Sequence, residues 1–274
     1  MTFLLAAVLA SAGASAATWD ARLGAVSGDV HVLPAGGEAE VDAEEGMPVE
    51  PGDRIRTGEG SAELVLEPES VVEIGPAADV SVGALERDGS WISVAVGRVL
   101  AKIRSAAGLS LSVHTPTAVA AVRGTEFAVE VDPGKAANVG VFDEGRVWVS
   151  PAQGAEPFEE TALGPGQETR VSPDAFDARG GRKILRVGPL KRLAIHRKAV
   201  ARLVARRVQL RKSWRAMTPK QRNARRAAFL KRRARLRRDF RKERKAARES
   251  RAKAKERAKE RAKERAKERA EEKR

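Results

Sequence analysis

Short apolar runs in which every second residue is polar fill the chain between residues 18 and 177. The runs at 91–96 and 126–131 show this alternation, and clusters of Gly, Pro and Asp stand between successive runs. A period of two residues turns one face of a strand to a core and the other to water. Many such runs, with no helical stretch between them, predict an all-β domain of about 160 residues, long enough for a substantial core.

A faint repeat runs through this region. A turn glycine followed by an alternating strand recurs at 28–32, 97–101 and 145–149. Such recurrence favours a solenoid in which strand pairs stack on one another, but a sandwich of two sheets would show much the same pattern. The expected fold is therefore mainly β, either a β-solenoid or a sandwich.

Charge divides the chain into two parts of opposite sign. The formal net charge of +15 over 274 residues would by itself indicate a polyanionic partner. Residues 1–180, however, carry 12 basic and 28 acidic side chains, a balance of −16, whereas residues 181–274 carry 40 and 9, a balance of +31. Only the C-terminal part therefore has the character of a polyanion-binding protein.

The first residues have the pattern of an export signal. Residues 3–10 are apolar, small residues follow, and Ala-Ser-Ala at 14–16 fits a small-x-small cleavage site. The apolar run is shorter than the roughly 20 residues that span a bilayer, and no longer run follows it. We expect residues 1–16 to be a signal peptide and the mature chain to be periplasmic or secreted, without an integral membrane span. A buried N-terminal strand or helix is the alternative.

The chain lacks the residue spacings of common catalytic and metal sites. It has no Cys, which excludes disulfides, thiolate metal sites and a Cys nucleophile. Its three His residues lie far apart, and it contains neither a Gly-x-Ser-x-Gly elbow nor a phosphate-binding loop. We therefore expect no enzymatic activity, no cofactor and no metal ion.

Near residue 178 the chain changes character. We expect a linker over 178–188 and a basic helical tail over 189–274. Between Leu190 and Met217 a seam of mostly apolar residues recurs at steps of three and four, which predicts an amphipathic helix. This helix would dock on the β domain or pair with a second copy through residues 190–217. A membrane-surface helix with basic flanks is the alternative.

Two further helical features follow in the tail. Thr218-Pro219-Lys220-Gln221 has the pattern of a capping box at the start of a second helix. Residues 252–274 repeat Lys-Glu-Arg-Ala, and because four residues advance a helix by about 400°, the Ala stripe winds round the helix and forms no coiled-coil seam. We expect a solvated helix that acts as a spacer or cationic arm.

Two segments of the predicted β domain resemble a known family. Pro-Gly-Asp-Arg-Ile-Arg-Thr-Gly at 51–58 is similar to the opening half of a FecR domain, and the stretch 113–129, which contains Arg-Gly-Thr-Glu-Phe, is similar to its later half. The similarity extends over about 25–172, inside a predicted domain of residues 17–177. The motif residues, with structural or partner-binding roles, are Gly52, Asp53, Thr57, Gly58, Thr115, Pro116, Arg123, Gly124, Thr125, Glu126, Phe127 and Gly145.

The resemblance implies a function. Members of this family that regulate iron uptake join this domain, in the periplasm, to one membrane helix and to a cytoplasmic segment that engages a sigma factor. The present sequence shows neither of these two parts, so the resemblance implies an exported, non-enzymatic binding or sensing module of the cell envelope. Signalling across the membrane to a sigma factor is the alternative, if the natural start lies upstream.

Single motif residues allow specific expectations. A glycine at 124, where a strand is entered, indicates a positive φ or a close approach of the backbone. Arg123 and Glu126 are expected to form a partly buried pair that pins two strands, and the alternative is an arginine that binds an anion or a partner. Asp53 is expected to cap its own turn, with metal ligation as the alternative.

The basic tail has several candidate partners. We expect it to contact an anionic envelope surface, such as lipid headgroups, lipopolysaccharide or a wall polymer, or an envelope protein. Nucleic acid is disfavoured because the tail has few aromatic residues and the chain is expected to be exported. Attraction between the acidic body and the basic tail, within a chain or between copies, is a third possibility. The expected tail contacts are Arg225, Arg226, Arg232, Arg233, Arg237 and Arg238.

Overall fold

The computed structural model describes most of the chain between residues 21 and 218. The described residues are 21–218, apart from 38–39, 67–69, 87–88, 105–109, 153–159 and 173–184, together with isolated positions and adjacent pairs between 220 and 250. The predicted signal peptide, residues 178–184 of the predicted linker and the Lys-Glu-Arg-Ala repeat lie outside them.

Sixteen strands form within the described residues, and they pair in two sheets that share the long strand β8 (Ser90–Lys102). Sheet 1 has the order β1 (Ala21–Ser27), β5 (Ser61–Leu66), β6 (Ser70–Ile74), β8, β11 (Glu126–Val131), β12 (Ala137–Val141), β15 (Gln167–Val171) and β16 (Val187–Pro189). Sheet 2 has the order β3 (Val41–Asp42), β2 (Val30–Leu33), β4 (Arg54–Thr57), β7 (Asp79–Ala84), β8, β9 (Leu111–His114), β10 (Ala118–Val122), β13 (Val147–Pro151) and β14 (Thr161–Leu163).

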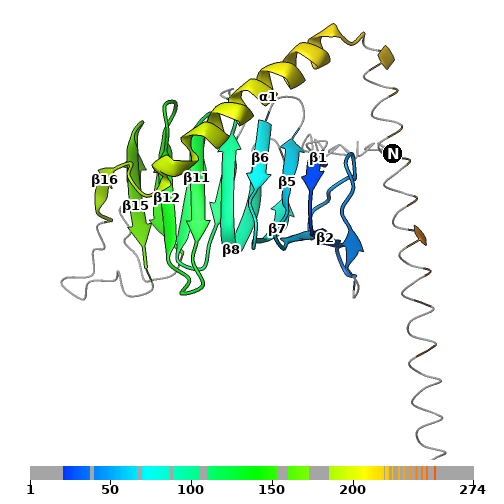
Figure 1. Ribbon diagram of the computed structural model, residues 1–274, viewed down its shortest axis with the longest axis horizontal. Coiled ribbons are helices and arrows are strands. Elements are labelled where there is room, and N and C mark those ends of the chain that lie inside the picture. Colours follow the sequence, from blue (N-terminus) through cyan, green and yellow to red (C-terminus); the bar gives the residue numbers. More distant parts are fainter. Residues whose placement is uncertain are drawn as a thin grey trace, which may run out of the picture.

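The main core lies between the two sheets. Inward residues such as Leu64 and Val129 of sheet 1 and Ile55, Val94 and Val113 of sheet 2 are fully buried in one cluster. Strand pairs are laid alternately in the two sheets, since β9–β10 belong to sheet 2, β11–β12 to sheet 1, β13–β14 to sheet 2 and β15–β16 to sheet 1. The prediction of a mainly β fold is confirmed, and the fold combines the facing sheets of a sandwich with the stacked strand pairs of a solenoid (Figure 1).

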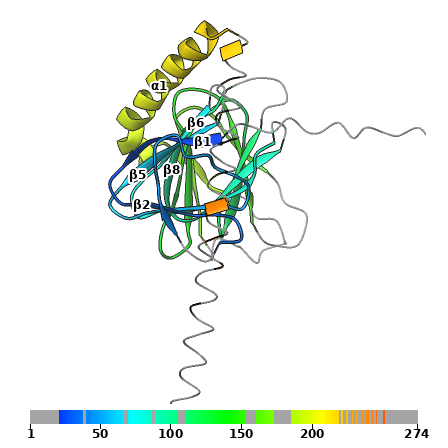
Figure 2. The ribbon, with the colours of Figure 1, turned by 90° about the vertical axis from the view of Figure 1, so that its right-hand side faces the viewer.

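A helix covers the outer face of sheet 1. The short helix η1 (Leu193–His196) leads directly into α1 (Arg197–Ala216), which crosses this face diagonally (Figures 1 and 2). Leu193, Val200 and Leu203 pack in a second apolar cluster with side chains of sheet 1. The seam that the sequence predicted is thus buried against the β domain over its first half. In the part of the chain that the structure describes, no helix combines the length and the apolar character needed to cross a bilayer.

The helix begins later than expected, whereas the capping box beyond its far end is as predicted. Val187–Pro189, which the sequence assigned to the linker and the first helical position, form the edge strand β16, and helical structure begins only at Leu193. At the far end the predicted capping box is present, because the Gln221 N–H donates to Thr218 Oγ1 at 3.3 Å and the Thr218 N–H donates to Gln221 Oε1 at 2.8 Å.

Candidate interaction site

The two glycines of the later motif lie against each other. Gly124 has a φ of +65°, which confirms the expected left-handed turn, and Gly145 has a φ of +93°. A Cβ atom on Gly145 would lie 2.5 Å from both the Gly124 carbonyl oxygen and Thr125 Oγ1, so only glycine fits there. Thr125 Oγ1 donates to the Arg146 carbonyl at 3.0 Å and accepts its N–H at 3.2 Å. These contacts join the segments that lead into β11 and β13.

A buried lysine beside this turn was missed by the sequence reasoning. The Lys102 side chain is 1% exposed, and its Nζ donates to Glu126 Oε1 at 2.8 Å and to the Glu144 carboxylate. The predicted Arg123–Glu126 pair is wrong, because Glu126 stands opposite Lys102 in the register of β11 with β8, while Arg123 is exposed. The sequence did contain one indication of this buried ion pair, because residue 102 is the only charged residue in the apolar run 99–103.

The earlier motif residues stabilise turns. The Asp53 carboxylate accepts the Glu50 N–H at 2.8 Å and the Ala35 N–H at 2.9 Å, so it caps its own turn and ties in a second loop. Thr57 Oγ1 donates to the Gly75 carbonyl at 2.7 Å. Gly52 and Gly58 lie in the turns on either side of β4.

The remaining motif residues also lie within the fold. Thr115 Oγ1 accepts the Ala118 N–H at 2.8 Å and donates to the carbonyl of the same residue at 2.9 Å, which closes the turn that contains Pro116. Phe127 is fully buried in the main core. The motif residues therefore do not converge on one site, and only the 124–126 and 144–146 segments meet.

Ion pairs connect the outer face of sheet 1 to the helix that covers it. The Arg192 guanidinium binds the Glu130 carboxylate, and this hydrogen bond raises the pKa of Arg192. Further along, Arg197 pairs with Asp143, and Arg206 Nε lies 3.4 Å from Glu63 Oε2. The acidic β domain and the start of the basic tail therefore attract each other within one chain, which was one of the alternatives considered from the sequence.

Sheet 1 also holds the start of the helix. The two oxygens of the Glu168 carboxylate accept the N–H groups of Arg192 at 3.0 Å and of Leu193 at 3.1 Å, which satisfies free donors at a helix N-terminus. A Cβ on Gly140 would lie 2.7 Å from Leu190 Cδ1 and 2.8 Å from Leu193 Cδ1. Both leucines can therefore pack on β12 only because residue 140 has no side chain.

His196 lies in the same interface. Its side chain is largely buried, with Nε2 at 3.8 Å from Glu130 Oε2. Burial, and secondarily the charge of Arg98, lower the pKa of His196, while Glu130 opposes this shift. At neutral pH the imidazole is therefore uncharged in the interface between η1 and sheet 1.

Comparison with known proteins identifies the β domain. Residues 53–148 match the family model described as FecR protein. The chain contains a FecR domain. The match begins at Asp53 and ends at Trp148, inside the 17–177 domain expected from the motif resemblance.

Two solved structures align with part of the chain. Both are crystal structures of a candidate anti-sigma factor from Parabacteroides distasonis, and both are 15% identical to the present chain. The first aligns with a TM-score of 0.42 over 53% of this chain and 64% of its own, and the second with 0.40 over 51% and 60%. The chain therefore spans less than two thirds of the length of these relatives. No curated protein matches the chain.

The tail beyond the FecR domain is described only in part. Of the six arginines expected to make contacts, Arg238 is described and is exposed, and Arg225, Arg226, Arg232, Arg233 and Arg237 lie outside the described residues. Within the described residues, no three His, Asp or Glu side chains converge as metal ligands would. The candidate interaction site is thus the helix-covered face of the FecR domain and the basic surface that the helix presents.

Proposed function

We propose that the chain is a non-enzymatic regulatory or sensing module of the bacterial cell envelope, exported after removal of residues 1–16. The observation that carries this proposal is the FecR family match over residues 53–148. The motif side chains support the non-enzymatic part of the proposal. Asp53, Thr125 and Glu126 are all engaged in turns or ion pairs of the fold. In this reading the FecR domain contacts an envelope partner, and the basic helices contact an anionic surface.

The charge of the helical segment supports the contact with an anionic surface. Residues 181–218 contain 13 Lys and Arg and no Asp or Glu. Three of these arginines pair with the FecR domain, whereas Lys191, Lys198 and Arg202 are exposed. Each basic residue near an anionic lipid surface contributes about 1 kcal/mol of attraction, which falls as salt screens it.

Vesicle binding tests this part of the proposal. The triple variant Lys191→Gln, Lys198→Gln, Arg202→Gln should bind phosphatidylglycerol vesicles at least about tenfold more weakly than the unchanged chain, because three such attractions are lost. The matched control replaces three exposed basic residues of the FecR domain, Arg123→Gln, Lys135→Gln and Arg146→Gln, and should bind as before.

Two outcomes contradict the proposal. Equal binding to uncharged phosphatidylcholine vesicles would show that charge does not drive the contact. Tighter binding to duplex DNA than to anionic vesicles or wall polymer, at matched salt, would favour a nucleic-acid partner.

Signalling to a sigma factor is a second candidate role, which the FecR match also favours. Genes for a sigma factor and an outer-membrane receptor beside the gene for this chain would support it. A gene that stands apart from both would favour the envelope role alone.

A further inference from the structure

The outer face of sheet 2 is divided into a charged part and an uncharged part. On β4 and β7, Arg54 and Arg56 pair with Asp79 on this face. From the first half of β8 through β9, β10 and β13 to β14, none of the outward positions holds Asp, Glu, Lys or Arg, in a chain in which 32% of residues are charged. We call this second part the neutral face, and its central residues are Trp91, Ser93, Ser112, His114, Ala121 and Trp148.

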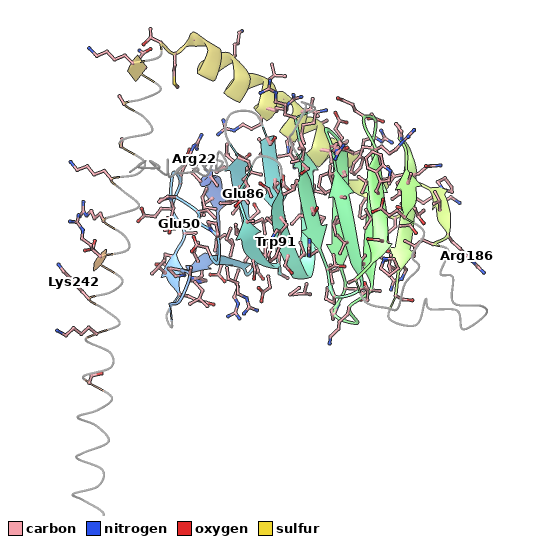
Figure 3. All side chains as sticks on the ribbon, turned by 180° about the vertical axis from the view of Figure 1, so that it is seen from behind. Arg22, Glu50, Glu86, Trp91, Arg186 and Lys242 are labelled. Carbon is pink, nitrogen blue, oxygen red and sulfur yellow. The ribbon has the colours of Figure 1, made fainter. Side chains whose placement is uncertain are left out.

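Trp91 lies flat on the sheet. It is 38% exposed, and few other large apolar side chains in the described residues are exposed to this extent. Figure 3 labels its position on the sheet. A Cβ on Gly83 of β7 would overlap three consecutive indole atoms about the ring-fusion carbon Cε2. Because that carbon is fully bonded within the ring plane, the approach can only be to the ring face. The indole of Trp91 therefore packs directly against the backbone of Gly83, in space that a side chain at that position would fill.

Trp148 lies in the same cross-strand row. The register pairs Trp91 with Ser112, Ser112 with Ala121, and Ala121 with Trp148. Three strand spacings separate the two tryptophans by about 14 Å. The residues between them, Ser112 and Ala121, have small side chains, so no large side chain separates the two tryptophans along this row of four strands.

The next row supplies hydrogen-bonding groups without charge. Ser93 is paired with His114, His114 with Val119, and Val119 with Ser150. The His114 ring stacks on Trp91 with centroids 4.9 Å apart. Burial lowers the pKa of His114, so this imidazole is neutral at neutral pH and offers one donor and one acceptor. Hydroxyl groups of Ser93 and Ser150 offer both as well.

This combination fits one class of ligand. A sugar ring has an apolar face of C–H groups, which packs on the electron-rich face of an indole, and a rim of hydroxyl groups that pair with Ser and His. An anionic lipid surface or a nucleic acid would instead require basic residues, which the outward positions of these strands lack. We propose that the neutral face of the FecR domain binds an uncharged polysaccharide chain that lies along the row from Trp91 to Trp148 and pairs its hydroxyl groups with Ser93, His114 and Ser150.

Oligosaccharide titration of the full-length chain tests this inference, and it does not depend on the tail. The probes are chitohexaose and cellohexaose, measured by calorimetry and tryptophan fluorescence at about 1 M salt, where the Debye length of about 3 Å suppresses contacts of the basic tail. Saturable binding is expected with at least one probe. Trp91→Ala and Trp148→Ala should each weaken it by about tenfold or more.

Two further variants keep the test sharp. Ala121→Lys leaves both tryptophans in place and puts a long charged side chain between them on the same row, so it should also abolish binding even if the tryptophan variants fold poorly. Ile195→Ala removes an exposed apolar side chain of η1, 77% exposed, and should leave binding unchanged.

Three outcomes would overturn the inference. The first is that neither oligosaccharide binds, and the second is that binding persists unchanged in both tryptophan variants and in Ala121→Lys. The third is a dimer of the full-length chain, seen by sedimentation, that the same variants dissociate, since the neutral face would then be covered by a second copy.

Discussion

Lys102 holds a charged amine at a position where 1% of its side chain reaches solvent, and Glu126 offsets that burial. Because the Glu126 side chain is itself only 10% exposed, the two charges depend on each other for the loss of water. Glu144 also binds the amine but is 56% exposed, so water can replace its contribution.

Glu126→Gln should therefore lower the free energy of unfolding by about 3–5 kcal/mol, because it leaves a buried ammonium without its buried partner. Glu144→Gln is the matched control and should lower it by about 0–1 kcal/mol. Urea unfolding measures both. Equal effects of the two substitutions would contradict the assignment of Glu126 as the principal partner.

His114 provides a pH-dependent contribution at the same scale. Burial lowers its pKa, so the folded protein binds fewer protons than the unfolded chain once the pH falls below the ordinary His value of about 6.5. Stability is then lost as the pH falls from about 6.5 toward the folded-state pKa. The side chains opposite it in register, Ser93 and Val119, carry no charge that would counter this.

The variant His114→Phe keeps an aromatic ring against Trp91 and removes the titration. Its free energy of unfolding should fall less between about pH 7.5 and pH 5 than that of the unchanged protein. Part of the pH dependence should remain, because burial also lowers the pKa of His196. Unfolding curves at the two pH values decide the matter, and identical pH dependences in the two proteins would argue against a buried neutral His114.

At the scale of elements, the helix and the face it covers are matched in shape as well as in charge. Leu190 and Leu193 rest on Gly140 of β12, and Glu168 of β15 accepts the first free N–H groups of η1. Docking therefore depends on a glycine and a carboxylate of two neighbouring strands.

Gly140→Val should displace the helix without unfolding the sheets, since the added side chain enters space held by two leucine methyl groups. A loss of stability of about 1–3 kcal/mol is typical of such overpacking. Hydrogen exchange should show faster exchange in α1 and unchanged exchange in β11 and β8. Gly188→Ala on β16, two strands away in the same row of the sheet, is the control, because a Cβ there meets nothing within 4 Å. Unchanged hydrogen exchange in α1 of the Gly140→Val variant would contradict the claim that the helix docks through the packing of Leu190 and Leu193 on Gly140.

Local periodicity made the strands and the helical seam predictable. The alternation at 126–131 and the apolar steps from Leu193 to Leu203 each report burial within a single segment. The partner of Glu126 was not predictable in the same way, because the register of β11 on β8 brings Lys102 opposite it across 24 positions of the chain. Strand β16 was missed because three residues with a glycine and a proline show no alternation of their own.

At the scale of the whole molecule, the net charge of +15 describes neither part of it. The acidic FecR domain uses Glu63, Glu130 and Asp143 to hold the first basic helix. The charge balance of the sequence offered this attraction as one of three possibilities. It did not indicate which face would receive the helix, because that depends on which side chains the two sheets turn outward. The Trp91–Trp148 row was equally hidden, since it arises from the pairing of four strands.

The central claim is that this FecR-domain chain works in the cell envelope, and the position of its mature N-terminus tests it most directly. Cells that produce the full-length chain are fractionated, and the N-terminal peptide is identified by mass spectrometry. The account predicts a chain in the periplasmic or secreted fraction that begins at Ala17. A chain that remains in the cytosol with residues 1–16 intact would contradict it.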